Sequence, residues 1–190
     1  MYKFLRFICY LPVKILLPTK VIGKENLDKE GRIIIACNHQ SILDIAILII
    51  NLKRKIHFVG KKEIFKNKFL KWFFTKMGVI ELDRDNLDLY TIKKIISVLK
   101  NEEVLGIFPE GTRNKTEEPL LSFRDGTTLF AEKTNAPVVP MIITRMPKIF
   151  RRNKLIIGEK IYFEKGNEDN TEKLREKMLD MKTNTIKETK

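Results

Sequence analysis

The sequence predicts an α/β protein, a layered domain with helices flanking a central sheet that is mostly parallel or mixed. Short apolar runs alternate with helical patterns along the chain, as they do in α/β domains. The 190 residues suit a single domain, and 43% of them are hydrophobic, which is enough for a core. Together with few Gly and Pro residues (9 and 7), this composition excludes a disordered or collagen-like chain.

The strands are predicted from continuous apolar runs that end in turn residues. The clearest is RIIIAC at 32–37, which is β-branched throughout its centre and therefore suits a buried strand. The others are expected at 56–60, 78–83, 104–108 and 138–144, with one or two more between 155 and 163.

The helices are predicted from apolar residues repeating at helical spacing. A helix is expected to begin near Asn86, because Leu89, Ile92, Ile96 and Leu99 form one apolar stripe behind it. Further helices are expected at 41–52, 66–77, 125–135 and 171–181, and a polar loop at 109–122.

Residues 1–18 are predicted to form a separate interfacial segment, and 19–190 the folded domain. The segment is mostly apolar, with Lys3, Arg6 and Lys14 and no acid, and is too short to span a bilayer, which needs about 20 apolar residues. On a helix the three cations fall within an arc of about 80°, although Pro12 makes this only approximate. This pattern is typical of an amphipathic helix lying in a membrane surface. A terminal helix docked on the protein's own core remains the alternative.

The charge of the chain suggests an acidic partner, with well-solvated surface lysines that bind no partner as the alternative. Lys and Arg number 37 against 24 Asp and Glu, a net charge of +13. An anionic membrane, nucleic acid or an acidic protein would fit, but no nucleic-acid motif is present, so nucleic acid is not expected. Cys9 and Cys37 are too few for a disulfide scaffold or most zinc sites, which fits a reducing, cytosol-facing compartment.

Polar residues follow the predicted strand at 32–37. With His39 in the turn and Asp44 in the first helical turn, the carboxylate can orient the imidazole as a general base. Ser41 fits better as a helix cap than as a nucleophile, which favours direct transfer to an acceptor hydroxyl. A His and an Asp that only cap the helix would produce the same pattern.

Two arginines follow other strands. Arg84 and Arg113 can each offer a rigid fork to a phosphate, and Gly111 allows close backbone approach. Combined with the His39 and Asp44 pair, they suggest a site that holds a phosphomonoester beside a hydroxyl. Two ordinary surface turns are the alternative.

Taken in order, these segments resemble the glycerolipid acyltransferase family, the 1-acylglycerol-3-phosphate acyltransferases in particular. NHQSILD matches the family's HxxxxD box, GVIELDR its second motif, FPEGTR its third and VVPM its fourth. GKKEIF at 60–65 and FRDG at 123–126 also match.

The resemblance implies that a fatty acyl group passes from acyl-carrier protein or acyl-CoA to the sn-2 hydroxyl of lysophosphatidic acid, giving phosphatidic acid for phospholipid synthesis. His39 would be the base and Asp44 its orienting partner. No cofactor or metal would be needed, since the thioester is already activated. The glycerol phosphate would be bound by Arg84, Glu110, Gly111, Arg113 and Lys62, although Lys61 is equally available for the last role.

The expected setting is the cytoplasmic face of the cell membrane, with anionic lipid as a partner; the sequence leaves the oligomeric state open. Another lysophospholipid or glycerol-3-phosphate remains an alternative acceptor, and a basic lipid- or nucleic-acid-binding module a more distant alternative. Glu81 departs from the family's second motif, and its side chain would point either into an acyl groove or to solvent. His57 is expected to be structural, with no acidic partner.

Overall fold

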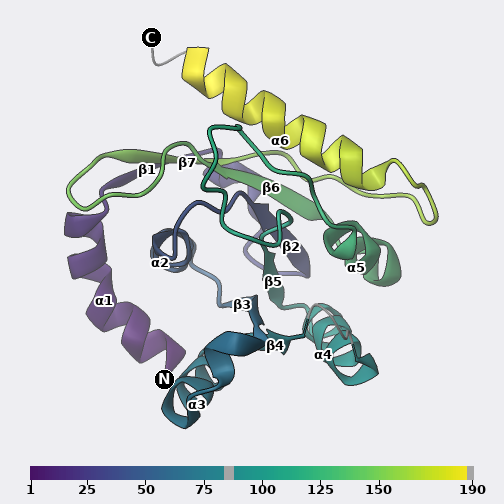
Figure 1. Cartoon of the computed structure of the whole chain (residues 1–190), viewed down its shortest axis with the longest axis horizontal. Helices are drawn as coiled ribbons and strands as arrows, with labels where there is room; N and C mark the ends of the chain where they lie inside the picture. The colour runs from purple at the N-terminus through teal and green to yellow at the C-terminus, as the bar shows by residue number, and fades with distance from the viewer. Residues whose placement is uncertain (84–87, 188–190) are drawn as a thin grey trace.

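The computed structural model describes residues 1–83 and 88–187. Within these residues seven strands form one sheet, in the order β1-β7-β6-β2-β5-β3-β4 (Figure 1). The five strands from β6 to β4 are parallel, whereas β7 runs antiparallel to β6 and β1 runs parallel to β7. The predicted α/β sheet is therefore confirmed. The strands are β1 (Thr19–Ile22), β2 (Ile33–Cys37), β3 (Ile56–Lys61), β4 (Ile80–Leu82), β5 (Val104–Ile107), β6 (Val138–Ile143) and β7 (Asn153–Ile157).

Helices cover both faces of the sheet, with α1 and α2 on one side and α4 to α6 on the other (Figure 1). The N-cap of α4 is Asp88, whose carboxylate accepts the Thr91 N–H at 2.6 Å, while the expected cap Asn86 lies outside the described residues. The helices are α1 (Tyr2–Leu16), α2 (Leu43–Asn51), α3 (Lys68–Met77), α4 (Leu89–Lys100), α5 (Gly126–Thr134) and α6 (Asn170–Lys187), with short 3-10 helices η1 (Lys24–Asn26) and η2 (Lys62–Phe65).

The core consists of two clusters divided by the sheet. Along β2, Ile33, Ile35 and Cys37 face the α2 side, and Ile34 and Ala36 face the α4 to α6 side. This alternation follows from the two-residue period of a strand. Since both faces of β2 are buried, its sequence is a continuous apolar run, and the strand is fixed at the centre of the sheet.

The N-terminal helix contacts the protein through the buried Tyr2, through Val13, which packs against the core, and through two of its cations. The Arg6 guanidinium donates to the Ile49 and Ile50 carbonyls at 2.9 and 3.3 Å, and Lys14 Nζ donates to Asn51 Oδ1 at 2.6 Å. These contacts place two of the three cations of α1 against the C-terminal end of α2, where carbonyls lack helical partners. The outward face is apolar: Phe4, Phe7, Ile8, Leu11 and Ile15 are all exposed, Phe7 to 80%.

Candidate active site

Sheet topology brings the predicted site residues to one edge. The parallel strands β4, β3, β5, β2 and β6 are neighbours, so their carboxyl ends lie along the same edge of the sheet. His39 follows β2, the FPEGTR segment at 108–113 follows β5, and Lys62 follows β3. Active sites of such sheets form in the loops at this edge. Arg84, which follows β4 by sequence, lies outside the described residues.

His39 and Asp44 form the predicted pair. His39 Nδ1 lies 3.0 Å from Asp44 Oδ2, and the two side chains are 15% and 0% exposed. An ionised carboxylate only accepts hydrogen bonds, so the ring must carry its proton on Nδ1. The lone pair is therefore left on Nε2, which has no hydrogen-bond partner among the described residues. This is the tautomer that a general base requires.

Asp44 also stabilises the turn, so the geometry contains both the contact expected of an orienting carboxylate and the contacts expected of a helix cap. Its Oδ2 accepts the Gln40 and Ser41 backbone N–H groups, each at 2.7 Å, and Ser41 Oγ accepts the Leu43 N–H at 3.2 Å. The carboxylate reaches back as in a capping box while it holds the imidazole. Asp44 Oδ1 is buried without a hydrogen-bond partner. The hydrogen bonds from the imidazole and from the turn therefore all go to the other carboxylate oxygen, Oδ2.

The His39 ring is also held by the loop that follows β5. It stacks on Phe108, with ring centroids 4.0 Å apart and planes inclined by 19°. The His39 N–H donates to Glu110 Oε1 at 2.8 Å, and the His39 carbonyl accepts the Asn114 N–H at 2.7 Å. Loop and turn are therefore locked together, and rotation of the ring is restricted from one side by Phe108 and at Nδ1 by Asp44.

Glu110 and Gly111 form this loop rather than an open carboxylate site. Glu110 is buried, and its Oε2 accepts the Leu121 N–H at 2.9 Å while Oε1 accepts that of His39. Gly111 has a φ of +68°, and a Cβ there would lie 2.8 Å from Arg124 Nε. Glu110 thus acts on the site through the backbone it holds, and Gly111 allows a tight turn under the Arg124 side chain.

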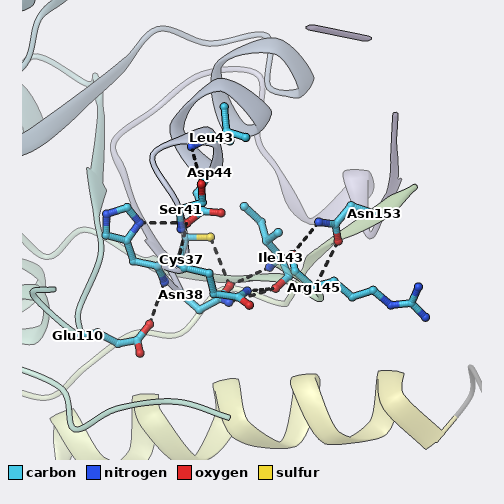
Figure 2. Close-up of polar contacts among 11 residues, drawn as sticks. Cys37, Asn38, Ser41, Leu43, Asp44, Glu110, Ile143, Arg145 and Asn153 are labelled. Atoms are coloured by element: carbon cyan, nitrogen blue, oxygen red, sulfur yellow. Dashed lines mark hydrogen bonds and ion pairs between the residues drawn. The ribbon is translucent and has the colours of Figure 1, made fainter. Parts of the chain in front are cut away.

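The other side of the turn is tied to β6 (Figure 2). Asn38 Oδ1 accepts the Ile143 N–H at 2.8 Å, and the Asn38 and Gln40 side-chain amides donate to the Ile143 carbonyl at 3.0 and 2.8 Å. Beneath them Cys37 is fully buried, and burial, reinforced by the Asp44 and Glu110 carboxylates, raises the pKa of its thiol well above the usual value. A thiol that stays protonated is a poor nucleophile, which agrees with direct transfer.

The cations predicted to bind phosphate differ in whether they already have a hydrogen-bond or ion-pair partner. Arg113 is exposed and makes no hydrogen bond or ion pair within residues 1–83 and 88–187. Lys62 Nζ donates to Asp83 Oδ2 at 2.9 Å, a bond that raises the pKa of Lys62, and Lys61 pairs with Glu63 at 2.9 Å. Arg113, on the loop that is bonded to the His39 carbonyl, is therefore free to take an anion, whereas Lys62 would have to exchange Asp83 for it.

The family is shown by comparison with known proteins. A protein-family model described as Acyltransferase matches residues 18–144, which contain the His39 turn and the 108–113 segment. The chain belongs to the acyltransferase family. The family prediction made from the four motifs is confirmed.

Relatives of this acyltransferase extend the match beyond the family model. The chain is 36% identical over 172 residues to the 1-acyl-sn-glycerol-3-phosphate acyltransferase of Bacillus subtilis, covering 85% of this chain and 83% of that one. It is 35% identical over 185 residues to the Saccharomyces cerevisiae protein of the same name, covering 90% of this chain and 61% of the yeast protein. The crystal structure of the 1-acyl-sn-glycerophosphate acyltransferase PlsC from Thermotoga maritima has a TM-score of 0.68 at 23% identity, and the match covers 100% of this chain and 98% of that one. That last likeness supports the fold.

Sequence reasoning missed two residues of the acyltransferase that hold the loop from outside the matched family region. On α6, Lys182 Nζ donates to the Pro119 carbonyl at 2.6 Å and Arg175 Nε to the Leu121 carbonyl at 3.2 Å. Lys182 is buried, and burial lowers its pKa, while Glu110, the Cys37 thiol and Asp44 oppose that shift. Because α6 is highly charged along its length, neither residue stands out in the sequence; the only signal is their spacing of seven, which puts both on one face.

Two smaller expectations are decided by ion pairs. Glu81 Oε2 lies 3.4 Å from Nζ of the exposed Lys71 on α3, which favours the interpretation that Glu81 points toward solvent. The prediction that His57 has no acidic partner was wrong, because its Nε2 lies 3.4 Å from Glu103 Oε1. Glu103 directly precedes β5, the strand paired with β3, so the contact is long-range and invisible in the local sequence.

Within the part of the chain that the structure describes, no helix is both long and apolar enough to cross a membrane. In the same residues no three His, Cys, Asp or Glu side chains gather as a metal site would require.

Proposed function

We propose that this acyltransferase moves a fatty acyl group from an acyl thioester to the sn-2 hydroxyl of 1-acyl-glycerol-3-phosphate, giving phosphatidic acid for phospholipid synthesis. The observation that carries the proposal is the Asp44-oriented imidazole of His39, with Nε2 free, in a turn bonded to the loop that bears an unpaired Arg113. The relatives named above support the choice of acceptor.

The chemistry follows from the tautomer of His39. Nε2 takes the proton of the acceptor hydroxyl, and the oxygen forms a bond to the thioester carbonyl carbon. Asp44 stabilises the imidazolium that results, because its Oδ2 already accepts from Nδ1. The carbon–sulfur bond then breaks, and the Nε2 proton passes to the departing thiolate. No covalent acyl-enzyme forms, in keeping with the protonated thiol of Cys37.

The acceptor is recognised by its phosphate. The Arg113 guanidinium can bind a phosphomonoester in two parallel hydrogen bonds, and its loop is bonded to His39 itself. Phosphate binding at Arg113 therefore brings the neighbouring hydroxyl to Nε2. Arg84 and Lys62 are proposed to complete the phosphate site, and Glu110 and Gly111 to shape it.

The enzyme is proposed to work as a peripheral protein on the cytoplasmic face of the cell membrane, with residues 1–18 as its interfacial segment. The apolar outward face of α1 supports this, because exposing Phe4, Phe7 and Leu11 to water is unfavourable unless lipid covers them. Arg6 and Lys14 serve to dock the helix on α2, so attraction to anionic lipid comes from the remaining positive charge.

An acyl-transfer assay with crossed substrates tests the activity. The full chain is given either acyl-CoA or acyl-carrier protein as donor, and lysophosphatidic acid, glycerol-3-phosphate or lysophosphatidylcholine as acceptor, with product identified by mass spectrometry. Phosphatidic acid is expected with lysophosphatidic acid and at least one donor. Transfer only to another acceptor would contradict the proposed substrate, and transfer to none would contradict the reaction.

Vesicle sedimentation tests whether the outward apolar face of α1 binds membranes. Replacing Phe4, Phe7 and Leu11 by Ser, with Arg6 and Lys14 kept, is expected to weaken binding to vesicles containing phosphatidylglycerol at least about tenfold. Binding of the unaltered chain should also weaken at high salt. Equal binding of the substituted chain would contradict a role for α1.

A further inference from the structure

The loop at 144–152, between β6 and β7, projects apolar side chains into solvent. Ile149 and Phe150 are 59% and 72% exposed, and Met146 is also exposed. The base of the loop is held by hydrogen bonds to the buried Asn153. Its side-chain amide donates to the Arg145 carbonyl at 2.7 Å (Figure 2), and its Oδ1 accepts from Thr144 Oγ1 at 3.0 Å. A firmly held loop with an apolar tip presents that tip to a partner.

The backbone at the tip is held in a conformation that its residue type disfavours. Phe150 has a φ of +61°, in the left-handed region that bulky residues rarely adopt. Its N–H donates to the Leu16 carbonyl at 2.7 Å, and the Arg151 N–H donates to the Lys148 carbonyl at 3.1 Å. Strain of this kind persists where the surroundings fix it, and it tends to mark functional segments. Here it turns an aromatic ring outward.

The bond to Leu16 joins the tip to α1. Leu16 is the last residue of that helix, and Ile15 and Leu16 are themselves exposed. In Figure 1 the connection between β6 and β7 passes the C-terminal end of α1. The tip therefore lies next to the C-terminal end of α1, where the apolar outward face of that helix ends at Ile15.

The charged residues of the loop itself are all positive. Lys148, Arg151 and Arg152 are exposed, and the sequence contains no Asp or Glu between Glu132 and Glu159. Cations flanking an aromatic and an aliphatic side chain suit a surface with anionic headgroups over an apolar interior. An acidic protein would be matched by the cations alone and would leave the exposed ring unexplained.

We propose that this loop is a second membrane-inserting element, with Ile149 and Phe150 entering an anionic bilayer and Lys148, Arg151 and Arg152 binding its headgroups. The inference rests on the proposed membrane docking and adds a second attachment point, so that two elements fix the orientation of the protein on the surface. The active-site edge is then held at one angle to the lipid that contains the acceptor.

Tryptophan fluorescence reports insertion directly, because Trp72 is the chain's single tryptophan. In a Trp72→Phe background, Phe150→Trp is compared with Tyr90→Trp, a site on α4 that is 74% exposed on the other side of the sheet. On vesicles containing phosphatidylglycerol and brominated lipid, the emission of the Phe150→Trp chain is expected to shift to the blue and to be quenched, while that of the control stays unchanged. No shift at position 150 would overturn the proposal.

A binding comparison gives a second readout. Replacing Ile149 and Phe150 by Ser is expected to weaken vesicle binding about tenfold, whereas the matched pair Leu89→Ser and Tyr90→Ser, both 74% exposed, should leave it unchanged. Transfer to a short-chain, water-soluble lysophosphatidate should be unaffected by either pair. Unchanged vesicle binding, or instead a raised KM for acyl-carrier protein alone, would overturn membrane insertion. If the unaltered chain had no acyltransferase activity, the assay with the water-soluble lysophosphatidate would show this independently of membrane binding.

Discussion

The turn that carries His39 and the loop that carries Arg113 are bonded to each other, yet their functional side chains are held in opposite ways. His39 is fixed by Asp44 at Nδ1 and by the Phe108 ring on one face. Arg113 is exposed and has no partner among the described residues. The difference teaches that the proposed proton-transfer groups are already assembled in the free protein, whereas the proposed phosphate-binding group would gain its partner only from the substrate. Loss of the first should act on kcat, and loss of the second on KM.

The largest effect is expected from His39→Ala. Removing the proposed base should lower kcat by about a hundredfold to ten-thousandfold, the range that general acid–base catalysis contributes. The chain's other histidine supplies the control: His57→Gln should retain most activity. Both variants are measured at saturating substrate together with their thermal unfolding. Near-normal turnover of the folded His39 variant would contradict its assignment as the base.

Asp44→Asn separates charge from geometry in the same turn. The amide oxygen can still accept the Gln40 and Ser41 N–H groups, but the negative charge beside the imidazole is lost. We expect kcat to fall by about a thousandfold while the fold is kept. Circular dichroism monitors the fold, and a variant that is folded and fully active would reduce Asp44 to a helix cap.

Arg113→Ala tests the other side of the comparison. Losing a charged hydrogen-bond donor to the phosphate should raise the KM for lysophosphatidic acid by about 10–100-fold, with the KM of the acyl donor nearly unchanged. Lys115→Ala, an exposed cation two residues further along the loop, is the matched control. If both substrates suffered equally, the phosphate role would be wrong.

Lys182→Met tests the loop from its far side. Without the donor to Pro119, the loop that carries Arg113 is less well positioned, so the KM for lysophosphatidic acid should rise about threefold to tenfold with a smaller change in kcat. Lys177→Met, an exposed position on the same helix, should behave like the unaltered enzyme. A merely structural role would instead reduce the amount of active enzyme and leave KM unchanged.

The smallest effect concerns pH and His57. Burial, together with Lys55, lowers the pKa of His57, and Glu103 only partly opposes this. The unfolded chain therefore binds the proton first, so stability should fall as pH drops below about 6.5, the ordinary histidine value. Urea unfolding across this range should show a flatter dependence for His57→Gln. Identical slopes would rule out His57 as a source of acid sensitivity.

The sheet and the contact between His39 and Asp44 could be predicted because their signals are local. The run at 32–37 is apolar throughout, and His39 and Asp44 are five residues apart. β1 was missed, since Thr19–Ile22 is short and half polar and becomes a strand by pairing with β7. The region at 155–163 contains the end of β7 followed by one isolated bridge at Ile161.

The supporting contacts of the site could not be predicted for a physical reason. Glu110 binds the His39 N–H across 71 residues of chain, and Lys182 binds the Pro119 carbonyl across 63. Such bonds depend on which backbone groups tertiary packing leaves unpaired, and no periodicity in the sequence encodes that. The same holds for Arg6, which a helical wheel places in the basic stripe of an interfacial helix but which instead binds the C-terminal end of α2.

The inward-facing Arg6 has a consequence for altering the N-terminus of this enzyme. Asp44 lies at the first turn of α2 and Arg6 at its last carbonyls, so each end of that nine-residue helix is bound by a charge of the favourable sign. Deleting the part of α1 that contains Arg6 would remove one of these charges and destabilise α2, the helix whose first turn contains Asp44. Replacing the exposed apolar side chains of α1, such as Phe4, Phe7 and Leu11, by polar ones would change its outer face and leave the contacts of Arg6 and Lys14 with α2 intact.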